Sequence, residues 1–444
     1  MYSEKIVKFS KIVPKNLYDL ISWTLLIYIC FCIVFARPFV GLSIFGVLIG
    51  ELTVAGLVFI SILLLIIPNK VFSNIDVKII LIIKSIIFCF FLSAFISGSS
   101  FYASYTYKTS SYIWTTVILF LGYFYISSFW TQRFPKFLII FILPYTYLIS
   151  TGNYPDNLII FFNTYADKFQ FIKAADLALG VIVVILLINS NFENNRFKAA
   201  YSFFIISIFA PVMLFNSRGS VLSLILFSFL YIFYEYKNIF KYKLFIFSIF
   251  LISISLFFAS TFRVYGNFDF YKDPEVLKVE YITEAVDGVI KNKDTAKVFL
   301  SFYFQDGYLM SRDSTTNWRL DIWQDVFYDL KNKEILMTGY GYKEIIPVML
   351  DPTAPGRLGR DGLNEHVHNY FVNILARGGF LQLFLFIAFY IYLIKYYKFR
   401  HGNYKILSLL LPVFILSSLD VTMEGVHFPF IFFSYLGYSL REGI

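Results

Sequence analysis

Three polar groups in this chain lie between its apolar stretches or in the long polar segment that separates two of them, and each carries side chains that could do chemistry. The first is His366-Val-His368-Asn369, where a long polar segment gives way to an apolar run. The others are Arg218, in Asn-Ser-Arg-Gly-Ser, and Arg319, in Asn-Trp-Arg-Leu-Asp. Ionisable groups held against the end of a hydrophobic helix are costly to place there, which makes them candidates for function.

The two histidines admit three roles. An imidazole titrates near pH ~6.5 and can take a proton from a hydroxyl, which would make one of them a general base. An interfacial pair without catalytic work is the plainer alternative. A metal site is a third, but only Asp361 and Glu365 are at hand as further ligands. Because no Asp-x-Asp pair is present either, we expect no metal site.

His368 is the better candidate for a base than His366. It precedes Asn369 at the predicted start of a helix, where backbone N–H groups and the positive end of the dipole disfavour an imidazolium ion. Asn369 could orient the ring, and His366 would have a supporting role.

Each arginine has a plain alternative as well. Arg218 could be an interfacial anchor whose charge reaches the membrane surface. However, with Ser217 and Gly219 it lies at a helix start, and a guanidinium beside a helix N-terminus binds anions well. Arg319 could be a solvated charge on an amphipathic helix, paired with Asp321 or Asp325.

The elements that must position these groups are membrane spans. Of the 444 residues 58% are hydrophobic and 15% charged, with a mean hydropathy of +0.68, against about 25% charged residues in soluble domains. A span needs about 20 apolar residues. Twelve are predicted, at 20–36, 41–67, 78–96, 110–129, 135–150, 174–189, 198–215, 220–236, 243–260, 376–394, 404–419 and 426–440. The predicted fold is an all-α polytopic helical bundle.

Basic residues gather on alternate connections between these spans. They are Lys5, Lys8, Lys11, Lys15, Lys70, Lys78, Arg133, Lys136, Arg196, Lys198, Lys237, Lys241, Lys243, Lys395, Lys398, Arg400 and Lys405. The opposite connections are poor in Lys and Arg, and one carries Asp420 and Glu424. The positive-inside rule then predicts a cytoplasmic N-terminus.

The same rule divides the chain into four parts. They are a cytoplasmic tail at 1–19, nine spans within 20–260, a large outer loop at 261–367, and three spans with a short cytoplasmic tail at 368–444. The outer loop has 13 Lys and Arg against 17 Asp and Glu, in a chain of net charge +9. A basic protein whose large loop is acidic is not a nucleic-acid binder.

Short helices packed as a cap are expected in the outer loop. Leu320, Trp323, Phe327 and Leu330 are spaced to share one helix face. Trp318, Trp323, Tyr340 and Tyr342 could stack on sugars, although packing inside the loop is the favoured role for them.

These features together resemble the O-antigen ligase and O-antigen polymerase superfamily. The residues that carry the resemblance are Ser217-Arg218-Gly219, Arg319 to Trp323, Gly339-Tyr-Gly341, and His368-Asn369 followed by Gly379. It covers about 200–400. The family moves a glycan from an undecaprenyl diphosphate carrier to an acceptor hydroxyl at the outer face of the inner membrane, without metal or nucleotide.

The resemblance implies roles for these residues. Arg218 and Arg319 would bind the donor diphosphate, helped by Ser217 and Gly219, and His368 would activate the acceptor, with inversion. The implied partners are the lipid-linked donor, a glycan or lipid A-core acceptor, membrane lipids and a chain-length regulator protein. Gln382 departs from the Gly-x-x-Gly-like spacing of ligases, which favours a polymerase of surface polysaccharide (O-antigen or capsule) over a ligase of lipopolysaccharide biosynthesis. A polysaccharide or lipid flippase is the alternative from another class.

Overall fold

The computed structural model describes residues 15–68, 75–126, 133–241, 243–266, 301–305, 307–352, 354, 357–358 and 365–444. Predictions that involve Lys5, Lys8, Lys11, Lys70, Asp361 or the segment 267–300 fall outside these residues.

Each of the twelve predicted spans overlaps a helical segment, although the span predicted at 41–67 begins in a short hairpin. These are α2 (Lys15–Phe35), α4 (Ile49–Ile66), α5 (Val77–Ile96), α7 to α8 (Ser111–Trp114 and Ile118–Tyr125, joined by the 3₁₀ turn η2, Thr115–Val117), α9 (Arg133–Ser150), α11 (Ala174–Asn191), α12 (Asn195–Asn216), α13 (Arg218–Ile239), α14 (Lys243–Tyr265), α17 (Tyr370–His401), α18 (Leu407–Leu419) and α19 (His427–Glu442). The predicted all-α polytopic bundle is confirmed.

Length separates these helices into two groups. Within the described residues, eight are long and apolar enough to cross a membrane, and Ser111–Tyr125, Pro135–Ser150 and Leu407–Leu419 are shorter apolar helices. The 13 residues of α18 rise only about 20 Å at 1.5 Å per residue, less than the roughly 30 Å of a hydrocarbon core. The chain is a multi-pass membrane protein in which some of the predicted spans are short helices.

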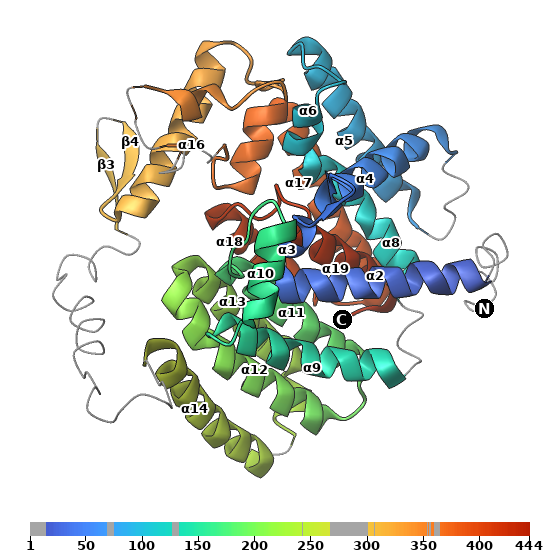
Figure 1. Ribbon diagram of the computed structural model, residues 1–444, viewed down its shortest axis with the longest axis vertical. Helices are drawn as coiled ribbons and strands as arrows, with labels where there is room; N and C mark the ends of the chain where they lie inside the picture. Colours follow the sequence, from blue (N-terminus) through green and yellow to red (C-terminus); the bar gives the residue numbers. More distant parts are fainter. Residues whose placement is uncertain are drawn as a thin grey trace.

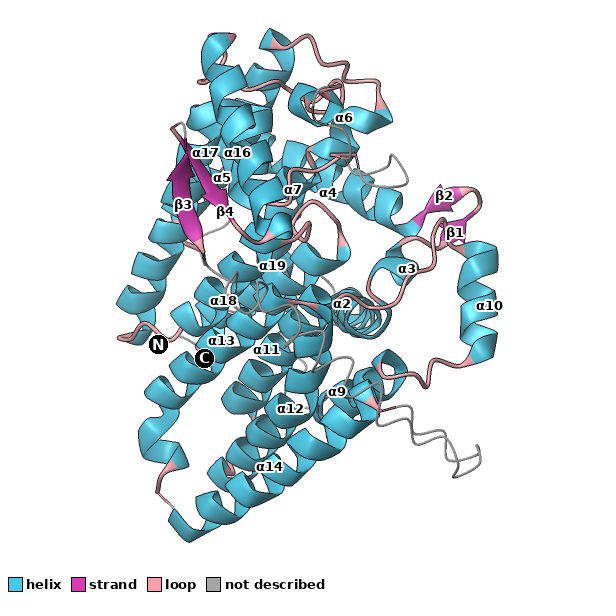
Figure 2. Ribbon diagram, turned by 90° about the vertical axis from the view of Figure 1, so that its left-hand side faces the viewer, coloured by secondary structure: helices cyan, strands magenta, loops and turns pink. Residues whose placement is uncertain are grey.

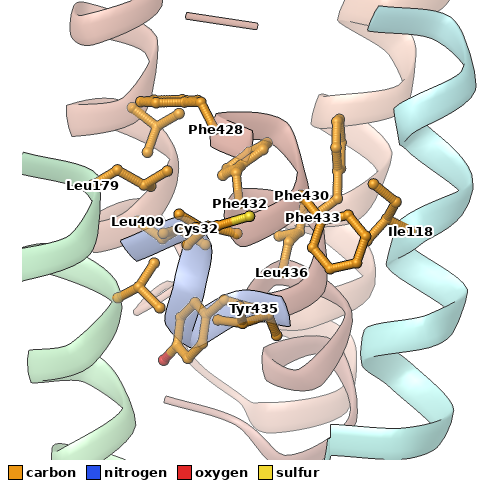
Figure 3. Close-up of a cluster of buried hydrophobic side chains, with 14 of the residues drawn as sticks. Cys32, Ile118, Leu179, Leu409, Phe428, Phe430, Phe432, Phe433, Tyr435 and Leu436 are labelled. Atoms are coloured by element: carbon orange, nitrogen blue, oxygen red, sulfur yellow. The ribbon is translucent and has the colours of Figure 1, made fainter. Parts of the chain in front are cut away.

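The centre of the bundle is built around α19. Figure 3 shows side chains such as Cys32 of α2, Ile118 of α8 and Leu179 of α11 gathered about its aromatic residues. A Cβ added to Gly122 would lie 2.0 Å from the Ser434 carbonyl oxygen, and one added to Gly437 would lie 2.0 Å from that of Leu119. Glycine on both helices therefore lets the backbones of α8 and α19 touch, as small residues do in membrane helix pairs.

Residues 301–369, which we call the cap, contain the hairpin of β3 (Phe302–Gln305) and β4 (Tyr308–Ser311), the helix α16 (Ser314–Asn332) and the 3₁₀ turn η5 (Pro347–Leu350). In β3–β4, Phe302 pairs with Ser311 and Gln305 with Tyr308. The sequence predicts only short helices here, and the hairpin is a departure from that prediction. Aromatic-rich strands favour pairing, and Gly307 supplies a positive φ of 84° beside the turn.

The remaining described elements are short. They are α3 (Arg37–Val40), the hairpin of β1 (Ser43–Ile44) and β2 (Val47–Leu48), α6 (Ser104–Thr109) and α10 (Asp156–Tyr165). Figure 2 shows α10 and the β1–β2 hairpin together at one side of the bundle, away from the cap.

The cap is joined to the bundle at a break in α17. Gly379, with φ 70° and ψ −173°, is not helical, so backbone groups around it lack partners within the helix. The segment 336–341 supplies them. The bonds are Tyr340 N–H to Ala376 C=O, Gly341 N–H to Arg377 C=O and Phe380 N–H to Leu336 C=O, at 2.7, 3.0 and 2.9 Å. Figure 1 shows α16 of the cap beside α17.

Glycine is required on both sides of this junction. A Cβ on Gly379 would lie 2.3 Å from the backbone of Met337, and one on Gly339 would lie 2.6 Å from the backbone of Arg377. Both glycines also have a φ of +70°. The Gly339-Tyr-Gly341 motif is thus the strip by which the cap lies against α17.

We predict that Gly379→Ala destabilises the protein strongly. A side chain at positive φ costs of order 1–3 kcal/mol before any clash with Met337. Gly56→Ala in α4 is the matched control, because nothing lies within 4 Å of its added Cβ. Melting temperatures in detergent check this. Equal melting temperatures for the two variants would contradict the junction described here.

Candidate functional site

Three helix ends meet below the cap. Ser217 caps α13, its Oγ accepting from Ser220 N–H at 3.3 Å. Asn369 caps α17, its Oδ1 accepting from the N–H groups of Phe371 and Val372 at 3.0 and 3.1 Å. In both ribbon views α18 lies between α13 and α17 (Figures 1 and 2). The site therefore lies where two helices begin and a third ends.

Direct contacts fix these three ends together. The Asn369 side chain donates from Nδ2 to the Ser418 carbonyl at 3.2 Å. A Cβ on Gly219 would lie 3.0 Å from Leu419 Cδ1. Gly219, predicted to help bind an anion, thus also allows the start of α13 to approach the end of α18, where Asp420 follows.

Arg319 comes to this place on the buried face of α16. Ile322, Val326 and Leu330 are completely buried, whereas Phe327 is 36% exposed. The predicted stripe is therefore right for Leu320 and Leu330, which are buried, and wrong for Phe327. The cap packs on the neighbouring face, and Arg319 lies one turn before Ile322 on that face.

The predicted alternative for Arg319, a solvated charge paired with Asp321 or Asp325, does not describe its surroundings. Those two carboxylates each lie 2.5 Å from the buried Arg357 guanidinium. The Arg319 Nε is buried and has no hydrogen-bond partner among the described residues. Burial lowers the pKa of Arg319, and the carboxylates of Asp420 and Asp313 oppose that shift.

Asp313 links the two arginines. Its Oδ1 lies 3.6 Å from Arg218 Nη1, and its charge also acts on Arg319. Arg218 starts α13 and Arg319 lies in the second turn of α16, so the link crosses from the bundle to the cap. The structure thus brings the two predicted arginines to one carboxylate, although 100 residues separate them in sequence.

His368 lies against Trp318, the residue before Arg319. Its ring packs edge-on to Trp318, with centroids 5.1 Å apart. Burial, together with the positive charges of Arg319 and Lys173, lowers the pKa of His368 to about 4. The ring is therefore neutral at pH 7. Its φ of 52° is unusual for a residue other than glycine, and strained residues of this kind gather at functional sites.

His366 stands in a second basic environment. Burial lowers its pKa to about 3, with further contributions from Arg377, Lys108, His368 and Lys173. Lys108 also lies 3.4 Å from the Glu365 carboxylate. His366 thus shares Lys173 with His368 but has Arg377 and Lys108 near it, whereas His368 has Arg319.

Two charged residues of the site were not predicted from the sequence to take part in it. Lys173, just before α11, acts on both histidines. Asp420 acts on Arg319, and burial raises the pKa of Asp420 against the opposing charges of Lys173 and Arg319. Both lie on connections that the sequence assigns to the outer side. That shared side was the only signal, and it does not say which loops meet.

Tyr340 and Tyr342 do not join the arginines and His368. The Tyr342 side chain is completely buried, and its hydroxyl lies 3.2 Å from that of Tyr112 and donates to Gln382 Oε1 at 3.0 Å. Tyr340 donates to Asp329 Oδ2 at 2.6 Å within the cap. These contacts fit the packing role that the sequence favours for them. Trp323 is likewise structural, since its Nε1 donates to the Val367 carbonyl at 2.7 Å.

In chemical terms the arrangement offers cations and a neutral imidazole side by side. Such a set can hold a multiply charged anion and accept a proton next to it. Among the described residues, no group of three or more His, Cys, Asp or Glu side chains is placed to hold a metal ion.

Comparison with protein families places part of the chain in a known family model. Residues 201–387 match the family model described as O-antigen ligase. The matched segment contains Arg218, Arg319, both histidines and the break in α17. It confirms the resemblance to the O-antigen ligase and polymerase superfamily. No curated protein matches the chain.

We predict that His368 stays neutral from pH 8 down to about pH 5, because its pKa is about 4 and a lowered pKa extends the neutral range toward acid. Arg319→Gln should move the titration to higher pH by removing one nearby positive charge. NMR of ring-labelled histidine measures both, with Arg196→Gln, at the opposite end of α12 from Arg218, as the control. A His368 ring that titrates near pH 6.5 in the unaltered protein would contradict the electrostatic description.

Proposed function

We propose that this protein transfers an oligo- or polysaccharide from an undecaprenyl diphosphate carrier to an acceptor sugar hydroxyl at the periplasmic face of the inner membrane. The observation that carries the proposal is the group formed by Arg218, Arg319 and His368 at one end of a membrane bundle. A diphosphate needs cations and an acceptor hydroxyl needs a base. The family match supports glycan transfer of this kind.

The donor diphosphate would lie between Arg218 and Arg319. Guanidinium groups match phosphate oxygens with two parallel hydrogen bonds. The Arg319 Nε, buried without a hydrogen-bond partner among the described residues, would gain one. Gly219 and the start of α13, which Ser217 caps through its Oγ, add N–H groups at the positive end of a helix dipole. Lys173 would supply a third positive charge.

His368 would take the proton of the acceptor hydroxyl. A ring with a pKa of about 4 is neutral but holds a proton weakly. A bound diphosphate would offset the charges of Arg319 and Lys173 that help to lower this pKa. The base would thus become stronger once the donor is in place, which favours transfer in the loaded site.

The reaction needs no further group. The acceptor oxygen attacks the anomeric carbon from the face opposite the diphosphate, and its proton goes to His368. The bond from that carbon to the diphosphate oxygen breaks, and the diphosphate leaves with the electron pair. A diphosphate leaves without a general acid, and the arginines stabilise its charge. The configuration at the anomeric carbon is therefore inverted, and arginine charge does the work that a divalent metal does in other transferases.

We predict that His368→Ala loses about 10²–10⁴-fold in transfer rate, as expected for loss of a general base, with donor binding nearly unchanged. His366→Ala should be milder, because His366 faces Lys108 and Arg377. Rate and donor affinity are measured side by side on the purified variants. If His366→Ala is inactive and His368→Ala is active, the base is misassigned; if both are active, neither histidine is the base.

Between the two glycan-transfer activities we propose the polymerase, in which the acceptor is a growing chain, with the ligase that transfers to lipid A-core as the alternative. Gln382, whose identity favours a polymerase in the sequence, lies fully buried and accepts a bond from Tyr112 at 2.7 Å. Its described hydrogen bonds are with Tyr112 and Tyr342. The polymerase proposal therefore depends on the departure of Gln382 from the ligase spacing in the sequence. A chain-length regulator is a proposed partner of the polymerase only.

Polysaccharide from a deletion strain separates the two activities. For a polymerase we predict single repeat units on the lipid A-core. A ligase would instead leave polymer on the lipid carrier that never reaches the core. Complementation with the unaltered gene and with His368→Ala is the control, and only the former should restore the surface glycan.

A further inference from the structure

The two carboxylate oxygens of Asp313 contact different groups. Oδ2 caps α16, accepting from the Thr316 N–H at 3.0 Å and from the Thr316 hydroxyl at 2.5 Å. Oδ1 lies 3.6 Å from Arg218 Nη1. The Asp313 side chain is 18% exposed and that of Arg218 is 53% exposed, so the carboxylate is the more enclosed partner.

The negative charge of Asp313 is not needed to cap the N-terminus of α16. Asn and Ser satisfy the first N–H groups of a helix about as well as Asp does. The charge does matter to the arginines, because it faces Arg218 directly and also acts on Arg319. A half-exposed ion pair adds little to stability. The position of this charge therefore points to the arginine site rather than to folding.

We propose that the Asp313 carboxylate stands in for a donor phosphate in the empty enzyme, holding Arg218 near Arg319 and releasing it to the diphosphate on binding. The inference rests on the proposed function, since it takes the arginines to be the diphosphate site. Asp313 is then a positioning residue: it keeps the two guanidinium groups together without touching the reacting atoms.

Two consequences follow from this exchange. A diphosphate carries more charge than one carboxylate, so it displaces Oδ1 from Arg218 and leaves the capping bonds of Oδ2 in place. Asp313 also repels the incoming anion, so anions with a single charge compete poorly for the site. Removing the charge should tighten binding of diphosphate, but it should leave the arginines less well aligned before binding.

The test is calorimetric binding of inorganic pyrophosphate to the purified full chain. Asp313→Asn and Asp313→Ser keep a capping oxygen and should retain the melting temperature. Both should bind pyrophosphate about five- to tenfold more tightly, because one nearby like charge is gone. Asp321→Asn is the control: it removes a charge from the same helix, and Asp325 still pairs with Arg357. It should bind as the unaltered protein does.

Kinetics give a second readout that a purely structural residue would not move. The donor KM should fall in Asp313→Asn while kcat stays level or falls. Pyrophosphate affinity that is equal in the unaltered protein and both Asp313 variants, or weaker in the variants at an unchanged melting temperature, would overturn the inference and leave the diphosphate site standing. If pyrophosphate binds none of these proteins, the proposed donor site itself fails, and the inference with it.

Discussion

The site depends on keeping the guanidinium of Arg319 charged while that side chain is half-buried and its Nε is enclosed. Taking Arg319 out of water is costly, and the cost is offset by carboxylates from two other elements, Asp313 before α16 and Asp420 after α18. Burial, with the charges of Arg319 and Lys173 added to it, lowers the pKa of His368 and keeps its ring neutral. Arg319 thus requires acids beside it and also favours the neutral form of the histidine. A lipid diphosphate would complete this balance of charge.

The backbone brings these groups together through the break in α17. The helix begins at Tyr370, directly after its N-cap residue Asn369. Its break at Gly379 exposes backbone groups to which the cap binds by hydrogen bonds. The cap in turn carries Arg319 on the buried face of α16. The start of α13 lies against Leu419, with Gly219 at the contact. Arg218, the first residue of α13, therefore faces Asp313 of the cap from the bundle. Small residues at close contacts and caps at helix starts therefore position the charges.

The sequence predicts the helices well because length and hydropathy are local properties, and it singles out Arg218, Arg319 and His368 because charges beside apolar runs are conspicuous. It does not predict their partners. Asp313, Lys173 and Asp420 lie on three different connections, and only tertiary packing shows which loops meet. Of the stripe predicted on α16, Leu320 and Leu330 are buried, but Phe327 is not, because the cap packs on the neighbouring face that Ile322 and Val326 form. The role of Gly339 and Gly341 depends on a break in a helix far along the chain.

The most direct measurement of the central claim uses purified protein in lipid vesicles with a defined glycan on undecaprenyl diphosphate and a matching acceptor. Released undecaprenyl diphosphate is counted against new glycosidic bonds, and NMR gives the anomeric configuration of the product. We expect one carrier diphosphate released for each bond formed, with inverted configuration, and neither product from His368→Ala. Movement of the intact donor across the membrane without bond formation, or a product of retained configuration, would contradict the account.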